Sequence, residues 1–149
     1  ANALEGKPLR VYGDGRQVRD WLYVGDHCEA IRTVLARGRP GEVYNVGGNA
    51  EMRNLEVVHM LCDTLQSLAP REGGYRGLVT FGADRPGHDR RYAIAATKPR
   101  GELDWAPGET FAPGIEPPVR WYLDTAGWVA GVRSGEYRRW IETNYVKRM

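Results

Sequence analysis

Apolar residues recur at helical spacing in two segments of the first half of the chain. Downstream of Asp26 the spacing predicts a helix that ends at Gly38, with an apolar face of Ala30, Ile31, Val34 and Leu35. Asp26 and Glu29 have the spacing of a capping box at its start. A clearer helix follows Asn54, which we expect at the N-cap position. Its apolar stripe is Leu55, Val58, Cys62, Leu65 and Leu68.

Short runs of β-branched and aromatic residues predict strands around these helices. Residues 11–13 and 16–24 flank the turn Gly13-Asp14-Gly15. Residues 41–48 (GEVYNVGG) predict a buried strand that runs into a glycine turn, and residues 78–81 predict a further short strand. Strands and helices therefore alternate in the first half of the chain, which indicates a mixed α/β fold of short elements.

Helices dominate the second half of the pattern. We expect one helix over residues 97–103, a turn at 105–107, and then a helical tail. The tail's apolar positions are Val119, Trp121, Tyr122, Leu123, Trp128, Val129, Val132, Tyr137, Trp140 and Ile141. Pro113, Pro117 and Pro118 interrupt it, and an interior proline costs about 3 kcal/mol. The helix is therefore predicted to restart with Pro117 near its first position.

Composition narrows the class of protein. The 149 residues are 42% hydrophobic and 27% charged, which is typical of one soluble domain, and no apolar run approaches the roughly 20 residues of a membrane-spanning helix. Cys28 and Cys62 fall in apolar helical patterns, which predicts two buried, reduced thiols and a cytoplasmic protein. Residues 1–5 read as the end of a helix stopped by Gly6, so we expect the sequence to begin inside a larger protein.

Several kinds of chemistry are disfavoured by spacing. Gly13-Asp14-Gly15 lacks the third glycine of a dinucleotide fingerprint and precedes a predicted strand, so a hairpin turn is expected there. The three histidines and two cysteines do not have metal-ligand spacing, and no nucleophile–base arrangement is evident. The net charge of +2 is too small to indicate nucleic-acid binding.

Arginine is the more informative residue type. Arg19 lies in a strand otherwise suited to burial, where an unpaired charge is costly. Its counter-ion is either Asp20 or Asp26 within the chain, or a phosphate group, which suits the planar guanidinium. The residues alone leave both open.

Three segments that follow predicted strands carry groups suited to an anion. One contains Arg19, the second ends at the helix N-terminus of Asn54, and the third is the loop DRPGHDRRYAI (residues 84–94) with Arg85 and His88. Ligands of α/β folds bind beyond the ends of strands. The pattern therefore indicates three anion-friendly segments, and a diphosphate ligand would use all three.

The same segments resemble a known family. The stretches that carry the resemblance are KPLRVYGDGRQVRDWLYVGDHCEAI, GEVYNVGGNAEMRNLEVV, DRPGHDRRYAI, ELDWAP and SGEYRRWIETNY. They are similar to the C-terminal part of the dTDP-glucose 4,6-dehydratases, in the extended short-chain dehydrogenase/reductase superfamily. Epimerases and decarboxylases share versions of RDWLYV, whereas the DRPGHDRRYAI loop combined with the tail is more specific to the dehydratases. Ala95 and Arg10 depart from the family, which usually has Asp and Pro there.

The resemblance implies that residues 1–149 form the nucleotide-sugar-binding lobe. Arg10, Val11 and Tyr12 would flank the thymine, while Arg19 and Arg85 would grip the diphosphate. Asn54 and His88 would complete the site. The full set of substrate-binding residues that it implies is Arg10, Val11, Tyr12, Arg19, Asn54, Asp84, Arg85, Pro86, Gly87 and His88.

The resemblance also implies what lies elsewhere. NAD would be bound by an N-terminal Rossmann domain that is largely absent here, and the full-length enzyme would be a homodimer. The family reaction oxidises C4 of the sugar, eliminates water across C5–C6 and returns the hydride to C6. Its Tyr-x-x-x-Lys pair does not occur in this sequence, so no catalytic residue is assigned, and the chain alone is expected to be inactive.

Two alternatives stay open. One is a nucleotide-sugar epimerase or decarboxylase of the same superfamily. The other is a noncatalytic nucleotide-binding module or a nucleic-acid-binding surface, which would need clustered basic residues with exposed aromatic ones. Core-like tryptophan patterns and nearly balanced charges (21 basic, 19 acidic residues) argue against that second class.

Overall fold

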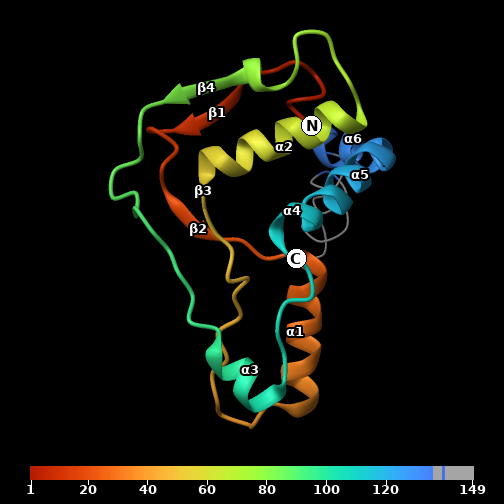
Figure 1. Cartoon of the computed structure of the whole chain (residues 1–149). Coiled ribbons are helices and arrows are strands. Elements are labelled where there is room, and N and C mark those ends of the chain that lie inside the picture. The colour runs from red at the N-terminus through yellow and green to blue at the C-terminus, as the bar shows by residue number, and fades with distance from the viewer. Residues whose placement is uncertain (136–138, 140–149) are drawn as a thin grey trace.

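The computed structural model describes residues 1–135 and 139, and it has the predicted mixed α/β character (Figure 1). In chain order the elements are β1 (Leu9–Tyr12), β2 (Val18–Asp20), α1 (Val24–Arg37), β3 (Glu51–Arg53), α2 (Asn54–Leu68), the 3-10 turn η1 (Arg76–Leu78), β4 (Val79–Gly82), α3 (Thr97–Leu103), α4 (Phe111–Gly114), α5 (Glu116–Asp124) and α6 (Ala126–Ser134).

The strands form two small sheets. β1 pairs with β4 in parallel, with Tyr12 opposite Gly82, and β2 pairs with β3 antiparallel, with Arg19 opposite Met52. The segment after β4 then runs beside β2, because Val18 N–H donates to Arg90 C=O at 2.8 Å and Tyr92 N–H donates to Val18 C=O at 3.0 Å. The loop that leaves β4 is thereby fixed to the strand that carries Arg19.

Two hydrophobic clusters lie in different parts of the molecule. The first contains buried Ala3, Tyr75 and Cys62 of α2, and side chains of β1 and β4 pack against it. The second contains buried Ala30, Leu103 and Trp105 between α1 and α3. Figure 1 shows α1 and α3 together as a lower arm, below the body formed by β1, β4 and α2.

Helix positions follow the predictions closely, except for the cap residues at the starts of α1 and α2. The helix over 97–103 is confirmed as α3, and α5 carries prolines in its first turn as expected. However, α1 begins at Val24 with Tyr23 at the N-cap, so Asp26 is not the cap residue. The Asp26 carboxylate instead accepts the N–H of Glu109 at 3.0 Å, which ties α1 to the segment before α4.

The predicted strand over residues 41–48 is wrong. Within residues 1–135 no strand pairs with this segment, and it is irregular up to β3. Tyr44 and Val46 pack against the second cluster, so their apolar character reflects burial against helices. The strand expected over 16–24 is likewise reduced to the three residues of β2, because only these pair with β3.

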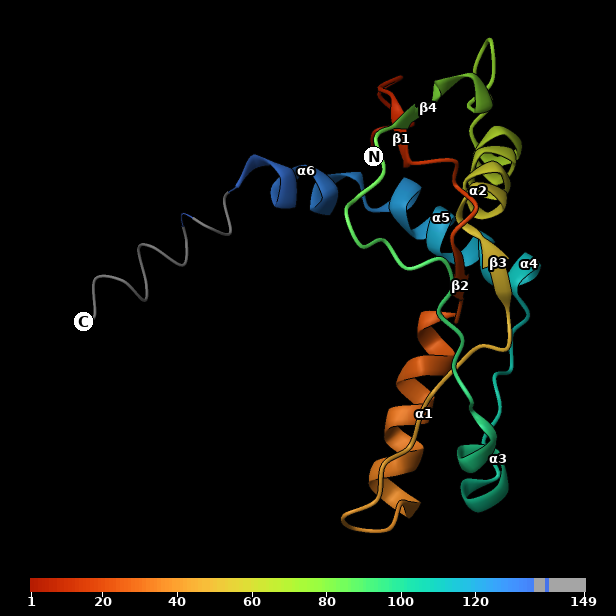
Figure 2. The same cartoon turned by 90° about the vertical axis from the view of Figure 1, so that its left-hand side faces the viewer.

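Several predicted core positions are exposed. Trp121 and Trp128 are 44% and 54% exposed, and their rings contact each other edge to face with centroids 5.0 Å apart. Figure 2 shows that α6 projects away from the body, so no described element covers the side of α5 and α6 that carries these two tryptophans. Cys62 is buried as expected, whereas Cys28 lies on the exposed face of α1. The expectations for Tyr137, Trp140 and Ile141 lie outside the described residues.

The described helices include none with both the length and the apolar character needed to cross a bilayer.

Candidate functional site

The glycine turn at residues 13–15 packs closely between the predicted site segments. Gly13 has φ +58°, and a Cβ there would lie 2.8 Å from Cγ of Asp84. A Cβ at Gly15 would lie 2.8 Å from Cγ1 of Val11 and 2.9 Å from Cβ of Leu55. Because β1 and β4 are parallel, the turn and the loop that begins at Asp84 both follow the carboxyl ends of these strands and start on the same side of the sheet.

This turn does not fit a dinucleotide. It leads into β2, whereas a dinucleotide fingerprint needs a helix whose N-terminus receives the pyrophosphate. A turn is present here, but it is not the predicted hairpin, because β1 pairs with β4 and β2 pairs with β3. Among residues 1–135 and 139, no three His, Cys, Asp or Glu side chains gather as a metal site.

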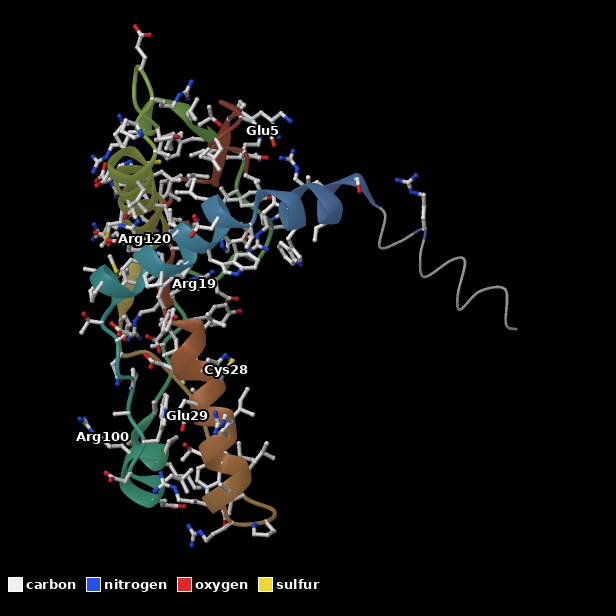
Figure 3. All side chains as sticks on the ribbon, turned by 90° about the vertical axis from the view of Figure 1, so that its right-hand side faces the viewer. Glu5, Arg19, Cys28, Glu29, Arg100 and Arg120 are labelled. Atoms are coloured by element: carbon white, nitrogen blue, oxygen red, sulfur yellow. The ribbon has the colours of Figure 1, made fainter. Side chains whose placement is uncertain are left out.

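Arg19 lies half-buried in the middle of the molecule, above the start of α1 (Figure 3). Its Nη1 donates to Val18 C=O at 2.7 Å and its Nη2 donates to Asp89 C=O at 3.0 Å. The guanidinium carbon lies 4.6 Å from the centroid of the Tyr92 ring, in cation–π contact. These neutral partners fix the direction of the guanidinium without cancelling its charge.

Arg85 approaches the same place from the loop after β4. Its guanidinium carbon lies 5.5 Å from the centroid of the Tyr12 ring. The hydrogen bond to Asp89 raises the pKa of Tyr92, and the positive charges of Arg19 and Arg85 both act to lower the pKa of this hydroxyl. Both guanidinium groups therefore lie within electrostatic range of Tyr92.

Neither Arg19 nor Arg85 forms an ion pair with a carboxylate in the described part of the chain. Asp20 and Asp26, the internal partners considered for Arg19, are engaged elsewhere: Asp20 accepts the N–H groups of Gly48 and Ala50 at 2.9 and 2.8 Å. Arg91 provides the contrast within the same loop, because Glu51 binds it at 2.6 and 2.7 Å. The internal-pair interpretation of Arg19 is therefore wrong.

Asp84 and His88 form the second polar group of the loop. Asp84 Oδ1 lies 2.6 Å from His88 Nδ1 and also accepts the N–H of Arg85 at 2.9 Å. These hydrogen bonds, that of His88 foremost, lower the pKa of Asp84. Pro86 and Gly87 form the turn between them, with Gly87 at φ +67° and the His88 N–H donating to Arg85 C=O at 3.1 Å.

Asn54 is the first residue of α2 and not its cap, which is Arg53. Its N–H donates to Gln17 C=O at 2.9 Å, and the Leu55 N–H donates to Gly15 C=O at 3.0 Å. These two donors are therefore unavailable to an anion, contrary to the expectation of free N–H groups at this helix start. The half-buried Asn54 side chain has no hydrogen-bond partner among residues 1–135 and 139.

The three residues expected beside the base lie on β1. Strand alternation exposes Arg10 and Tyr12 and buries Val11, which is 6% exposed. Tyr12 thus offers its ring, and Val11 contributes to the core. Sequence reasoning missed Gln17, Asp89 and Tyr92, although Asp89 and Tyr92 belong to the loop of residues 84–94 that it singled out.

The comparisons with known proteins agree with the motifs. A family model described as GDP-mannose 4,6 dehydratase matches residues 1–117. The dTDP-glucose 4,6-dehydratase of Xanthomonas campestris pv. campestris is 59% identical over 140 residues, which cover 93% of this chain and 40% of that protein. The dTDP-glucose 4,6-dehydratase of Escherichia coli is 54% identical over 147 residues, covering 99% of this chain and 41% of that protein.

A solved structure shares the fold. The crystal structure of a dTDP-glucose 4,6-dehydratase from Streptomyces venezuelae, with NAD and TYD bound, matches with a TM-score of 0.76 and 42% identity. The match covers 85% of this chain and 37% of that chain. The chain thus spans about two fifths of the length of the curated relatives it matches. The resemblance inferred from the motifs is confirmed: the chain belongs to the nucleotide-sugar 4,6-dehydratase family of the extended short-chain dehydrogenases/reductases.

Proposed function

We propose that this chain is the substrate-binding part of a dTDP-glucose 4,6-dehydratase and that it holds the dTDP portion of the sugar nucleotide. The longer protein would use NAD to form dTDP-4-keto-6-deoxy-D-glucose from dTDP-D-glucose. The identities above 50% to dehydratases of that name favour this reaction over the epimerase or decarboxylase alternative.

One observation carries the proposal. Arg19 and Arg85 come from segments far apart in sequence, act on the same tyrosine hydroxyl, and have no carboxylate partner among the described residues. Two positive charges that both act on one hydroxyl also repel each other, so an anion with two charges stabilises both at once. A diphosphate has that charge and the oxygen geometry that guanidinium groups bind.

The other implied residues extend the site on both sides of this pair. Tyr12, on β1, would stack on the thymine beside Arg10, while Asn54 and His88 would donate to the nucleotide's oxygens. Asp84, Pro86 and Gly87 would shape the loop that presents Arg85 and His88. The exposed position of Tyr12, 55% accessible, leaves its ring available to a base.

Catalysis would belong to the part of the protein outside this chain. The sequence has neither a dinucleotide fingerprint nor a Tyr-x-x-x-Lys pair, so we expect NAD to bind in an N-terminal Rossmann domain. The chain alone would bind dTDP without turning over the sugar nucleotide. The full-length enzyme would be a cytoplasmic homodimer that supplies rhamnose or another deoxysugar.

A nucleic-acid-binding surface is the rival of a different class. The exposed aromatic face of Trp121, Tyr122 and Trp128 is its strongest feature. Yet the neighbouring arginines are neutralised, because Arg120 pairs with Glu116 and Arg133 pairs with Glu5. Such a surface needs free positive charge beside the rings.

Calorimetry with dTDP, UDP and single-stranded DNA tests the proposal. We expect dTDP to bind, and Arg19→Ala and Arg85→Ala each to weaken it at least about tenfold, because each removes a charged hydrogen bond. Arg76→Ala is the matched control, since the Arg76 guanidinium is already paired with Asp63. Circular dichroism checks that every variant is folded. Tight, salt-sensitive DNA binding by a folded chain that ignores dTDP would contradict the proposal.

A further inference from the structure

Gln17 connects the three segments of the candidate site, although no motif assigns it a role. Its amide nitrogen donates to Asp84 Oδ2 at 3.3 Å and makes a longer contact of 3.5 Å with Tyr12 C=O. Its own backbone C=O accepts the N–H of Asn54 at 2.9 Å. One residue therefore joins the end of β1, the start of α2 and the loop at Asp84.

The orientation of the Gln17 amide follows from its partners. Tyr12 C=O and the Asp84 carboxylate are both acceptors, so the NH₂ group must face them. The Oε1 atom then points the other way, where it is buried without a hydrogen-bond partner in the described part of the chain. The side chain is only 5% exposed. A buried, half-satisfied amide is costly, and an apolar side chain of the same length would avoid that cost.

We propose that Gln17 is a positioning residue that sets the separation between the base-binding end of β1 and the diphosphate-binding loop at residues 84–88. This inference rests on the proposed function. A nucleotide diphosphate is held at two ends, and the second end binds well only when its partners are already at the right distance from the first. The Gln17 amide contacts both ends at once, through Tyr12 C=O on β1 and the Asp84 carboxylate in the loop. It can therefore set the distance between them.

The test compares whole and divided ligands in the complete, NAD-containing enzyme. For Gln17→Met we expect the KM of the sugar nucleotide to rise about fivefold to tenfold with kcat changed by less than about twofold, since only binding is affected. Binding of dTDP should weaken by the same factor, whereas thymidine and pyrophosphate, measured separately, should bind as they do to the unaltered enzyme. Thymidine and pyrophosphate each contact only one end of the site, so their binding does not depend on the distance between the two ends.

Gln66→Met is the matched control, because Gln66 is a half-buried glutamine of α2 whose amide bonds to the backbone of Arg71, away from the site. An unchanged KM in folded Gln17→Met would overturn the inference. So would an equal rise in Gln66→Met, or pyrophosphate binding weakened as much as dTDP binding. Should Gln17→Met not fold, Gln17→Asn, whose amide is one methylene too short to reach both partners, must give the same results. Failure of the unaltered enzyme to bind dTDP would instead overturn the proposed function, and this inference with it.

Discussion

At the residue scale, the charge of Asp84 is held in place by its neighbours. The carboxylate lies 2.6 Å from His88 Nδ1 and accepts N–H groups from Arg85 and Gln17. Hydrogen bonds to the charged form favour ionisation, so the pKa of Asp84 is lower in the folded chain than its ordinary value. Loop 84–88 is therefore ordered most strongly when Asp84 is ionised.

This arrangement predicts a dependence on pH. A carboxylate whose pKa is lowered by folding, such as Asp84, stabilises the folded chain at pH values above its unfolded-state pKa. This stability is lost as the pH falls through the folded-state pKa. We expect the urea midpoint of the unaltered chain to fall more steeply than that of Asp84→Asn below about pH 4. Circular dichroism at several pH values measures both midpoints. Asp124→Asn, at an exposed carboxylate at the end of α5, should retain the steep fall, and equal slopes for all three chains would contradict the prediction.

Arg19 was accessible to sequence reasoning, whereas Gln17, Asp89 and Tyr92 were not. An arginine in a strand suited to burial demands a counter-ion, so the residue pattern alone is enough to single out Arg19. Gln17 and Tyr92 carry no such demand, and only the folded chain brings them against Asp84 and Arg19. The choice between an internal carboxylate and a ligand for Arg19 also depends on the folded arrangement, in which Asp20 accepts two backbone N–H groups.

At the scale of elements, the turn at residues 13–15 fixes how β1 meets the loop after β4. Gly13 combines a left-handed backbone with close approach to Asp84, so both the φ angle and the missing side chain matter. Gly41 has φ +83°, and a Cβ added there would meet no atom within 4 Å. Substitutions at Gly13 and Gly41 therefore distinguish two costs. Both carry the cost of the left-handed backbone, but only Gly13 adds a clash at the site.

We expect Gly13→Ala to destabilise the chain by about 1–3 kcal/mol from backbone strain alone and by more through the clash, and to weaken dTDP binding by displacing Asp84. Gly41→Ala should show only the strain cost and bind dTDP normally. Urea unfolding and calorimetry on the same two variants provide the comparison. Equal stability losses, or equal dTDP affinities, would mean that the turn does not hold the loop.

Helices were easier to predict than strands, for a physical reason. A helix satisfies its backbone within itself, so the spacing of residues 97–103 was enough to locate α3. A strand needs a partner, and residues 41–48 have a strand-like composition but no strand beside them among the described residues. The same argument explains why β2 is limited to the three residues that face β3.

At the scale of the whole molecule, the division of the core into two clusters determines how the chain should unfold. The first cluster joins α2 to β1 and β4 through Cys62 and Tyr75, while the second joins α1 to α3 through Leu103 and Trp105. Figure 2 shows the α1–α3 arm extending below the body. Regions that do not share a core open with separate free energies.

Trp105→Ala should therefore act on the arm alone. Removal of a buried tryptophan costs about 3–5 kcal/mol, and Trp105 is 6% exposed in the second cluster. We expect amide hydrogen exchange to accelerate in α1 and α3 while protection in α2 and β4 is retained. Tyr75→Ala, at a residue 4% exposed in the first cluster, should give the reverse pattern. Acceleration throughout the chain in both variants would mean that the two clusters unfold as one cooperative unit, because each substitution would then lower the same global free energy of unfolding.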